Sequence, residues 1–226
     1  MRIAPVTISF FSYENSVQLI ARLLEYVPEI TPIILDNNPT RDEYGFEDCC
    51  GKEAFAHDVN SRILYRRNTK KPDIKVRSHG LGMDFALDFC KEYNFDWMLH
   101  IEPDCKITGR VWYDAITDAA IINKCDVVAM FKTTFGPIHP CLSFWRVRSI
   151  KHSFKLQPMD ITHPRFREFV SLPALLRETK PPKNARIKLE WDTAQKNWFE
   201  AAVKDRCVIV ENPGDISHKG WSSKRF

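Results

Sequence analysis

Two carboxylates directly follow an apolar run in the segment "DWMLHIEPDCKI", residues 96–107. Glu102 and Asp104 are separated by Pro103, which lacks a backbone donor and helps to end a strand. Because successive strand residues point to opposite faces, the two acids share a face. Two hard oxygen donors on one side suit Mg²⁺ or Mn²⁺, ions that often complete their shell with phosphate oxygens. Taken alone, the motif is more typical of acids that end a strand and bind nothing.

The segments that must position this pair alternate between strand and helix patterns. Short apolar runs predict strands at 6–11, 31–38, 62–68, 97–102, 126–131, 141–147 and 207–210. Apolar residues at helical spacing predict helices at 14–27, with Asn15 as the cap, at 80–93 and at 192–205. This order predicts an α/β fold with a mostly parallel, partly mixed sheet flanked by helices, in a single domain over 1–226.

The composition excludes several classes of protein. An apolar content of 44% with 12% aromatic residues argues against disorder, and the apolar runs are far shorter than the ~20 residues that cross a bilayer. The seven cysteines form no CxxC pair, and the N-terminus lacks the pattern of a cleavable signal. We therefore expect buried thiols and a cytoplasmic location.

The charge is unevenly distributed. The net charge of +4 is too small to identify a nucleic-acid-binding protein, but ten Lys and Arg stand against three acids between 144 and 186. Such a stretch is either a solvated basic face or a contact for an anionic substrate or membrane surface. A third interpretation is a non-enzymatic module that binds RNA, because aromatic side chains interleave with the cations there.

Polar residues follow three of the predicted strands, in "FFSYEN", "LDNN" and "IEPD". In open α/β sheets, ligands bind beyond the carboxyl ends of the parallel strands. These three segments therefore predict one site, and they favour a ligand-binding role for Glu102 and Asp104.

At these residues the chain resembles the GT-A glycosyltransferases, nearest in pattern to the inverting group called family 2. The resemblance is carried in order by "VTISFFSYENSVQLIARLLEYV" with "PIILDNN", by "HGLGMDFALDFCKEYNFDWMLHIEPD", by "LEWDTAQKNWFEAAVKDRCVIV" and by "DISHKGWSS". It implies a GT-A, Rossmann-like fold with a nucleotide-binding half at 1–107 and an acceptor-binding half at 108–226. It also implies transfer of a sugar from a nucleotide sugar, UDP-linked, to a glycan or other hydroxyl acceptor, with no nucleic acid as partner.

The resemblance implies a divalent metal, Mn²⁺ or Mg²⁺, with Asp104 as the safer ligand. The family usually has Asp where this chain has Glu102, so Glu102 contacts the ribose, a water or the metal. His218 is a further ligand or a donor to phosphate; a surface histidine in a polar tail is the alternative.

The nucleotide sugar is assigned to polar residues near the strand ends. Asp36 resembles the family's contact to uracil, although Asp also caps turns, and Tyr13 also suits a core. Gly80 and Gly82 are interpreted as a close backbone approach to the diphosphate or sugar. The residues expected to bind the donor are Ser12, Tyr13, Glu14, Asp36, Asn37, His79, Gly82, Asp84 and Glu102.

Inversion requires a base for the acceptor hydroxyl. The resemblance places it at Asp192, which begins the predicted helix 192–205 and also suits a structural cap, with Glu190 in reserve. A nucleotidyltransferase acting on a sugar phosphate is a rival, but the first strand is not followed by a glycine-rich, lysine-containing phosphate loop.

Overall fold

The computed structural model describes residues 1–9, 12–37, 56–68, 78–130, 142–150 and 207–218, and the side chains of these residues except for 78–81 and 207. The predicted helix 192–205 lies outside this part, and so do Asp192 and Glu190. Most of the basic stretch 144–186 also lies outside it.

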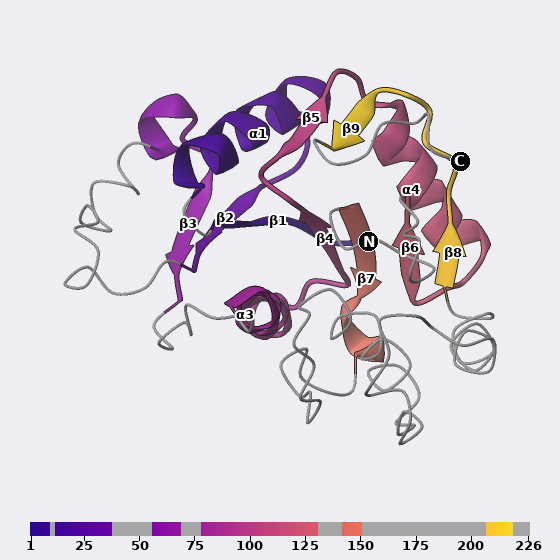
Figure 1. Cartoon of the computed structure of the whole chain (residues 1–226). Helices are drawn as coiled ribbons and strands as arrows, with labels where there is room; N and C mark the ends of the chain where they lie inside the picture. Colours follow the sequence, from indigo (N-terminus) through magenta and orange to yellow (C-terminus); the bar gives the residue numbers. More distant parts are fainter. Residues whose placement is uncertain (10–11, 38–55, 69–77, 131–141, 151–206, 219–226) are drawn as a thin grey trace, which may run out of the picture.

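A seven-stranded sheet forms the centre of the described chain (Figure 1). Its spatial order is β3-β2-β1-β4-β7-β6-β8, and only β7 runs against its two neighbours. The strands are β1 Ile3–Ser9, β2 Ile33–Asp36, β3 Leu64–Arg67, β4 Trp97–Ile101, β6 Val127–Ala129, β7 Leu142–Arg146 and β8 Cys207–Ile209. This confirms the predicted mixed, mostly parallel sheet.

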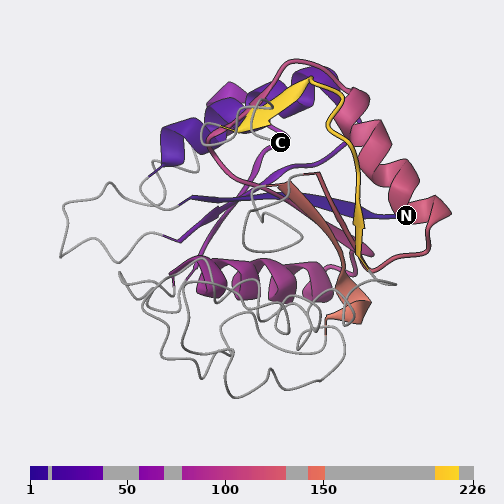
Figure 2. The same cartoon turned by 45° about the vertical axis from the view of Figure 1, so that its right-hand side comes forward.

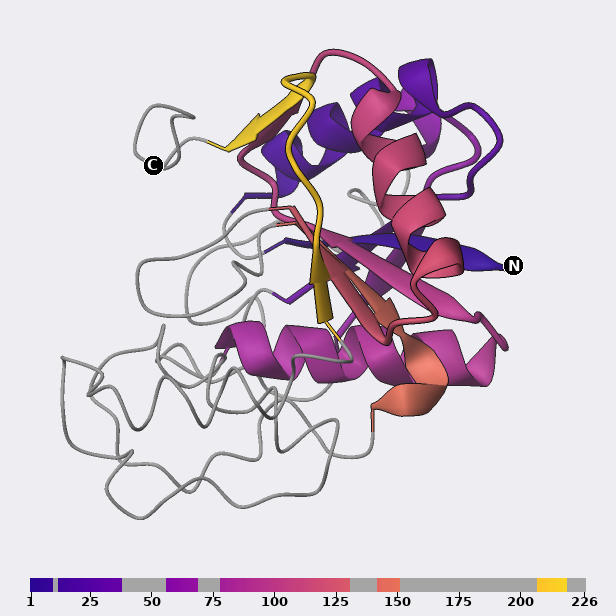
Figure 3. The same cartoon turned by 90° about the vertical axis from the view of Figure 1, so that its right-hand side faces the viewer.

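Helices cover both faces of the sheet. α1 (Tyr13–Tyr26) and α4 (Val111–Ile122) lie on one face, and α3 (Ser78–Glu92) lies on the other (Figures 2 and 3). α1 buries apolar side chains at helical spacing, and α3 does the same toward the opposite face. Each layer therefore has its own apolar core against the sheet.

A second sheet of two strands lies on the side of α1 and α4 (Figure 1). β5 (Cys105–Ile107) and β9 (Ile216–His218) pair antiparallel, with Cys105 opposite His218 and Ile107 opposite Ile216. Ile107 and Ile216 are buried in the core shared with α1 and α4. This pair joins the end of the chain to the turn that follows β4.

Three features differ from the expectations. The helix expected at 14–27 begins at Tyr13 with Ser12 as the N-cap residue, so the prediction of Asn15 as the cap is wrong. α4 was not predicted, because Val111, Ile121 and Ile122 are exposed and blur its amphipathic pattern. The three-residue strands β5 and β9 are too short for a periodicity to show.

Three cysteines of the described part, Cys90, Cys105 and Cys125, are buried, as expected for structural thiols. Burial raises the pKa of the Cys90 thiol to about 12, so it stays protonated and unreactive at neutral pH. Among the described helices, none has the length and apolar character needed to span a bilayer.

Candidate active site

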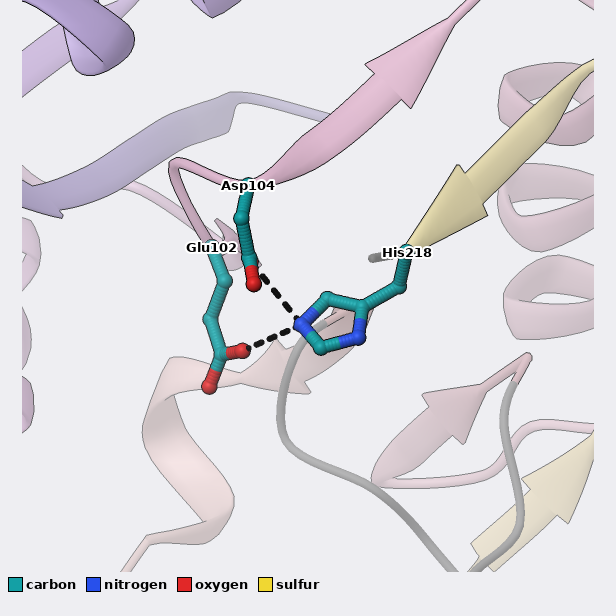
Figure 4. Close-up of side chains that lie close together, drawn as sticks. All are labelled: Glu102, Asp104 and His218. Atoms are coloured by element: carbon teal, nitrogen blue, oxygen red, sulfur yellow. Dashed lines mark hydrogen bonds and ion pairs between the residues drawn. The ribbon is translucent and has the colours of Figure 1, made fainter. Parts of the chain in front are cut away.

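Glu102, Asp104 and His218 converge at the carboxyl end of β4 (Figure 4). His218 Nε2 lies 2.9 Å from Glu102 Oε2 and 2.9 Å from Asp104 Oδ1. The imidazole is 8% exposed, while Glu102 and Asp104 are 22% and 44% exposed. The structure thus brings together the three residues predicted to bind metal, although His218 and Glu102 are 116 residues apart in the chain.

The local backbone explains this convergence. β4 ends at Ile101, and a turn at Pro103 and Asp104 leads directly into β5. Because Cys105 lies opposite His218 in the β5–β9 ladder, the imidazole is held next to the turn that carries both acids. Both acids lie beyond the end of β4, so the turn, and not alternation along a strand, brings their carboxylates to the same nitrogen atom.

The electrostatic balance of the cluster depends on His218. Burial lowers the pKa of the imidazole, but the hydrogen bond with Glu102 and the charges of Asp104 and Glu102 outweigh it, so the pKa lies above its usual value. A protonated His218 offsets the repulsion between two neighbouring carboxylates. A bound divalent cation would offset the same repulsion.

The donor set fits a divalent metal ion. One ligand atom from each of the three side chains lies within 4.8 Å of the others. Two carboxylates are suited to Mg²⁺ and Mn²⁺, and an imidazole is tolerated better by Mn²⁺. The chemistry of these residues therefore fits a divalent ion such as Mn²⁺ or Mg²⁺.

Asp36 and Asn37 lie at the carboxyl end of β2, and both are fully buried. The Tyr65 hydroxyl donates to Asp36 Oδ2 at 2.6 Å, and Asn68 Nδ2 donates to Asn37 Oδ1 at 2.7 Å. The backbone continues the pairing, because Asn37 N–H donates to the Ser9 carbonyl. These contacts bind the ends of three adjacent strands to one another.

Tyr65 and Asn68 were not predicted as part of this region. Both lie in the segment "RILYRRN", which was expected to be a strand. The pairing of β3 with β2 sets Asp36 opposite Arg67, so Tyr65, two residues earlier, faces the same side as Asp36. Only the strand pairing reveals this, since nothing near Tyr65 in the chain indicates its partner.

The start of α1 lies beside this buried group. The Tyr13 ring makes an edge contact with the Tyr65 ring, with centroids 6.1 Å apart, so Tyr13 is part of the core packing. The Ser12 carbonyl accepts from the backbone N–H and the hydroxyl of Ser16, and Glu14 is exposed in the first turn. Of these three residues, Glu14 is exposed, while Ser12 and Tyr13 are partly buried.

Gly82 lets α3 approach the carboxyl ends of β1 and β2 closely. A Cβ at this position would lie 2.6 Å from Ile8 Cγ2 and 3.3 Å from Asn37 Nδ2. The glycine is therefore required by packing, next to the region predicted to bind the donor. Asp84 is half-buried on the same helix, and the His79 side chain lies outside the described residues.

Comparisons with known proteins bear on the fold. No protein-family model matches the chain, and no curated protein matches it. Glucosyl-3-phosphoglycerate synthase from Mycobacterium tuberculosis, solved with Mn²⁺, UDP and glucosyl-3-phosphoglycerate, has a TM-score of 0.53 at 13% identity. The same enzyme with Mn²⁺, UDP-glucose and phosphoglyceric acid has a TM-score of 0.52 at 14% identity. Each match covers 98% of this chain and 73% of the enzyme.

A mannosyltransferase from Pyrobaculum calidifontis, solved with GDP-mannose and Mn²⁺, matches at a TM-score of 0.47 and 8% identity. That match covers 64% of this chain and only 44% of the mannosyltransferase, so this chain spans less than half of that enzyme. With a TM-score below 0.5, this match does not bear on the fold of the chain. The similarity to the synthase, together with the strand order, shows that the chain has the GT-A fold that its motifs predicted.

Proposed function

We propose that this chain is a metal-dependent glycosyltransferase that moves a sugar from a nucleotide sugar to a hydroxyl acceptor. The observation that carries the proposal is the convergence of Glu102, Asp104 and His218 at the carboxyl edge of a GT-A sheet. Ligands of open α/β sheets bind at this edge. A nucleotidyltransferase would use a similar sheet and metal, but it is disfavoured by the absence of a glycine-rich, lysine-containing segment after β1 in the sequence.

Asp104, Glu102 and His218 would hold Mn²⁺ or Mg²⁺, and the ion would supply Lewis-acid stabilisation of the departing diphosphate. Asp104 is the most exposed of the three, so its carboxylate would be the one nearest to a bound donor. Because a protonated imidazole cannot act as a ligand, His218 must release its proton when it binds the ion. The two negative charges of Glu102 and Asp104 then balance the two positive charges of the ion.

We assign the nucleoside to the carboxyl ends of β1 and β2 and to the start of α1, with a UDP-linked donor. Asp36 would accept from the N–H of the base, and Asn37, Ser12, Tyr13 and Glu14 would line the same region. Because Asp36 is fully buried and bonded to Tyr65, contact with a base requires neighbouring side chains to move apart. Gly82 and Asp84, with His79, would face the diphosphate or sugar from α3.

The reaction is proposed to invert the anomeric centre, with Asp192 as the general base and Glu190 in reserve. Support for these roles comes from the sequence: Asp192 begins a predicted amphipathic helix, which would fix its carboxylate. Asp192→Asn keeps size and capping ability but removes basicity. We expect unchanged donor affinity and a ~10²–10⁴-fold loss of transfer. A product with retained configuration would contradict this assignment.

The partners follow from this reaction: a nucleotide-sugar donor and a glycan or other hydroxyl acceptor, in the cytoplasm. An anionic surface is a further proposed contact for the basic stretch 144–186. Within the described part, the Arg146 guanidinium lies over the Trp97 ring at 5.1 Å and 3.8 Å from Asp126, so it belongs to the fold. Arg148 is exposed and remains available for such a contact.

The proposal is tested with a panel of nucleotide sugars, each measured with MnCl₂ and with EDTA. A donor at 100 times its dissociation constant should raise the free energy of unfolding by ~2.7 kcal/mol. A matching donor should also be hydrolysed slowly in the presence of Mn²⁺. If no nucleotide sugar stabilises the protein and nucleoside triphosphates do so instead, the nucleotidyltransferase alternative is favoured.

A further inference from the structure

We propose that Asp215 is a positioning residue that holds His218 in the metal site by fastening β9 to the start of α4. The inference rests on the proposed function, because it assumes that Glu102, Asp104 and His218 bind a metal ion. Asp215 lies immediately before β9 and three residues before His218. Its own contacts are to the segment between β5 and α4, away from the metal ligands.

The Asp215 carboxylate caps the N-terminus of α4, which has no side-chain cap of its own. The N-cap residue of α4 is Arg110, and it makes no side-chain capping hydrogen bond. Instead, the Trp112 backbone N–H donates to Asp215 at 3.1 Å from Oδ1 and 3.3 Å from Oδ2. An acid at this end is favoured by the free N–H groups of the first turn and by the helix dipole.

The backbone of Asp215 adds two contacts to the same segment. Its carbonyl accepts from the Thr108 backbone N–H at 2.8 Å and from the Thr108 hydroxyl at 3.2 Å. The side chain and the carbonyl of Asp215 therefore accept hydrogen bonds from both ends of the connection between β5 and α4. This connection follows the turn that carries Asp104 by only a few residues.

Gly109 leaves the space that the Asp215 side chain occupies. A Cβ at Gly109 would lie 2.8 Å from Asp215 Oδ2 and 2.9 Å from Asp215 Cβ. Real Cβ atoms do not approach other atoms so closely, so any side chain at 109 would displace the Asp215 carboxylate from Trp112. Gly109 thus offers a second way to disturb the anchor without changing Asp215.

β9 needs an anchor because its own pairing is weak. It forms three residue pairs with β5 in a sheet of two strands, and a two-stranded pair is marginal in water without further contacts. Burial of Ile216 fixes the first residue of the strand, but His218 is its last residue. Fixing the residue before the strand sets the register in which Cys105 lies opposite His218, and hence the place of the imidazole.

The experiment measures Mn²⁺ affinity of the full chain with MnCl₂ alone and with MnCl₂ plus UDP, by the electron paramagnetic resonance signal of free Mn²⁺. Asp215→Ala should weaken binding by ~10–100-fold, the usual loss when a group that orients a metal ligand is removed. Asp215→Asn keeps an oxygen acceptor for Trp112 and should stay close to the parent. Gly109→Ala should weaken binding like Asp215→Ala.

Asp114→Ala is the matched control, because Asp114 is an acid in the first turn of α4 whose carboxylate pairs with Arg110. It should leave Mn²⁺ affinity unchanged. All changes are then repeated in a His218→Ala background. Asp215→Ala should lower the melting temperature in both backgrounds. In the His218→Ala background it should cause no further loss of Mn²⁺ affinity.

This double comparison separates positioning from a purely structural role. An equal loss of Mn²⁺ affinity with and without His218, or an unchanged affinity in both Asp215→Ala and Gly109→Ala, would overturn the inference. If Asp215→Ala does not fold, Gly109→Ala measured in both backgrounds decides the matter. A parent that binds no Mn²⁺, or binding that survives Asp104→Ala, would instead overturn the proposed metal site.

Discussion

The ends of β2 and β3 and the turn after β4 both carry polar side chains at the carboxyl edge of the sheet, yet they differ in exposure. Asp36 and Asn37 are fully buried and are each bonded to a side chain of the neighbouring strand. Glu102 and Asp104 are partly exposed and share a single imidazole. Position at the edge is therefore not enough to identify a ligand.

The two regions also differ in the chemistry of their partners. Tyr65 and Asn68 are neutral donors, and each donates to a side chain at the end of β2. In the second region, two acids lie beside one histidine, and a proton on the imidazole or a bound cation offsets the repulsion between the carboxylates. The buried contacts of the first region hold strand ends together, whereas the second region offers partly exposed oxygen donors to an ion.

The largest effect that we expect is the loss of metal binding when Asp104 is replaced. Asp104→Ala should weaken Mn²⁺ binding by more than ~100-fold, beyond the loss typical of residues that only support a ligand. The metal-free protein should keep its stability, because removal of one acid also relieves repulsion from Glu102. Thermal unfolding with and without MnCl₂ and UDP measures both quantities.

Asp36→Asn is the control for that experiment, since it removes a charge at the same edge of the sheet. It should preserve the response to Mn²⁺ alone and weaken uridine nucleotides. Loss of the Mn²⁺ response in Asp36→Asn would show that the two regions are not functionally distinct.

The next effect concerns the stability of the buried region. Tyr65→Phe removes a 2.6 Å hydrogen bond to a buried carboxyl group and should lower the free energy of unfolding by ~1–3 kcal/mol. Chemical denaturation measures the change. Tyr93→Phe, at a half-exposed ring stacked on Phe89, should change stability by less than ~0.5 kcal/mol. Equal effects of the two substitutions would argue against a structural role for the Tyr65 hydroxyl.

A smaller effect is expected at Gly82, which packs against both β1 and Asn37. Gly82→Ala gains up to ~1 kcal/mol in helix propensity but loses ~1–3 kcal/mol from overpacking against Ile8. We expect a net loss of ~1 kcal/mol, with Mn²⁺ affinity unchanged, in a denaturation series that includes the exposed Glu92→Ala as control. A more stable variant would mean that α3 shifts without strain.

The smallest effect is the pH dependence of the metal-free cluster. The pKa of His218 is raised in the folded protein, so its stabilising contribution is fully present below the unfolded value of 6.5 and is lost as pH rises through the higher folded value. In EDTA, the stability difference between the parent and His218→Ala should therefore fall as the pH rises above the unfolded value and through the higher folded value. With saturating MnCl₂ it should rise, because only neutral imidazole binds the ion. A flat difference in EDTA would show that the cluster does not depend on a protonated His218.

The local pattern of the chain is sufficient to predict much of the fold. Pro103 predicts that the strand ends near Glu102, and apolar spacing predicts α1 and α3, because these features depend on neighbours in the chain. The order of the strands and helices predicts the mixed sheet, and the quoted motifs predict the GT-A fold. The roles of Asp192 and Glu190 remain predictions.

Tertiary structure alone decides which distant groups meet. The β5–β9 register sets His218 beside the two acids, the pairing of β2 with β3 joins Tyr65 to Asp36, and Asp215 caps α4 from another segment. None of these contacts has a local signature, since each depends on strand register and packing between segments far apart in the chain. Polar residues at strand ends are therefore visible in the sequence, but their burial and their partners, which separate structural groups from ligands, are set only when the layers pack.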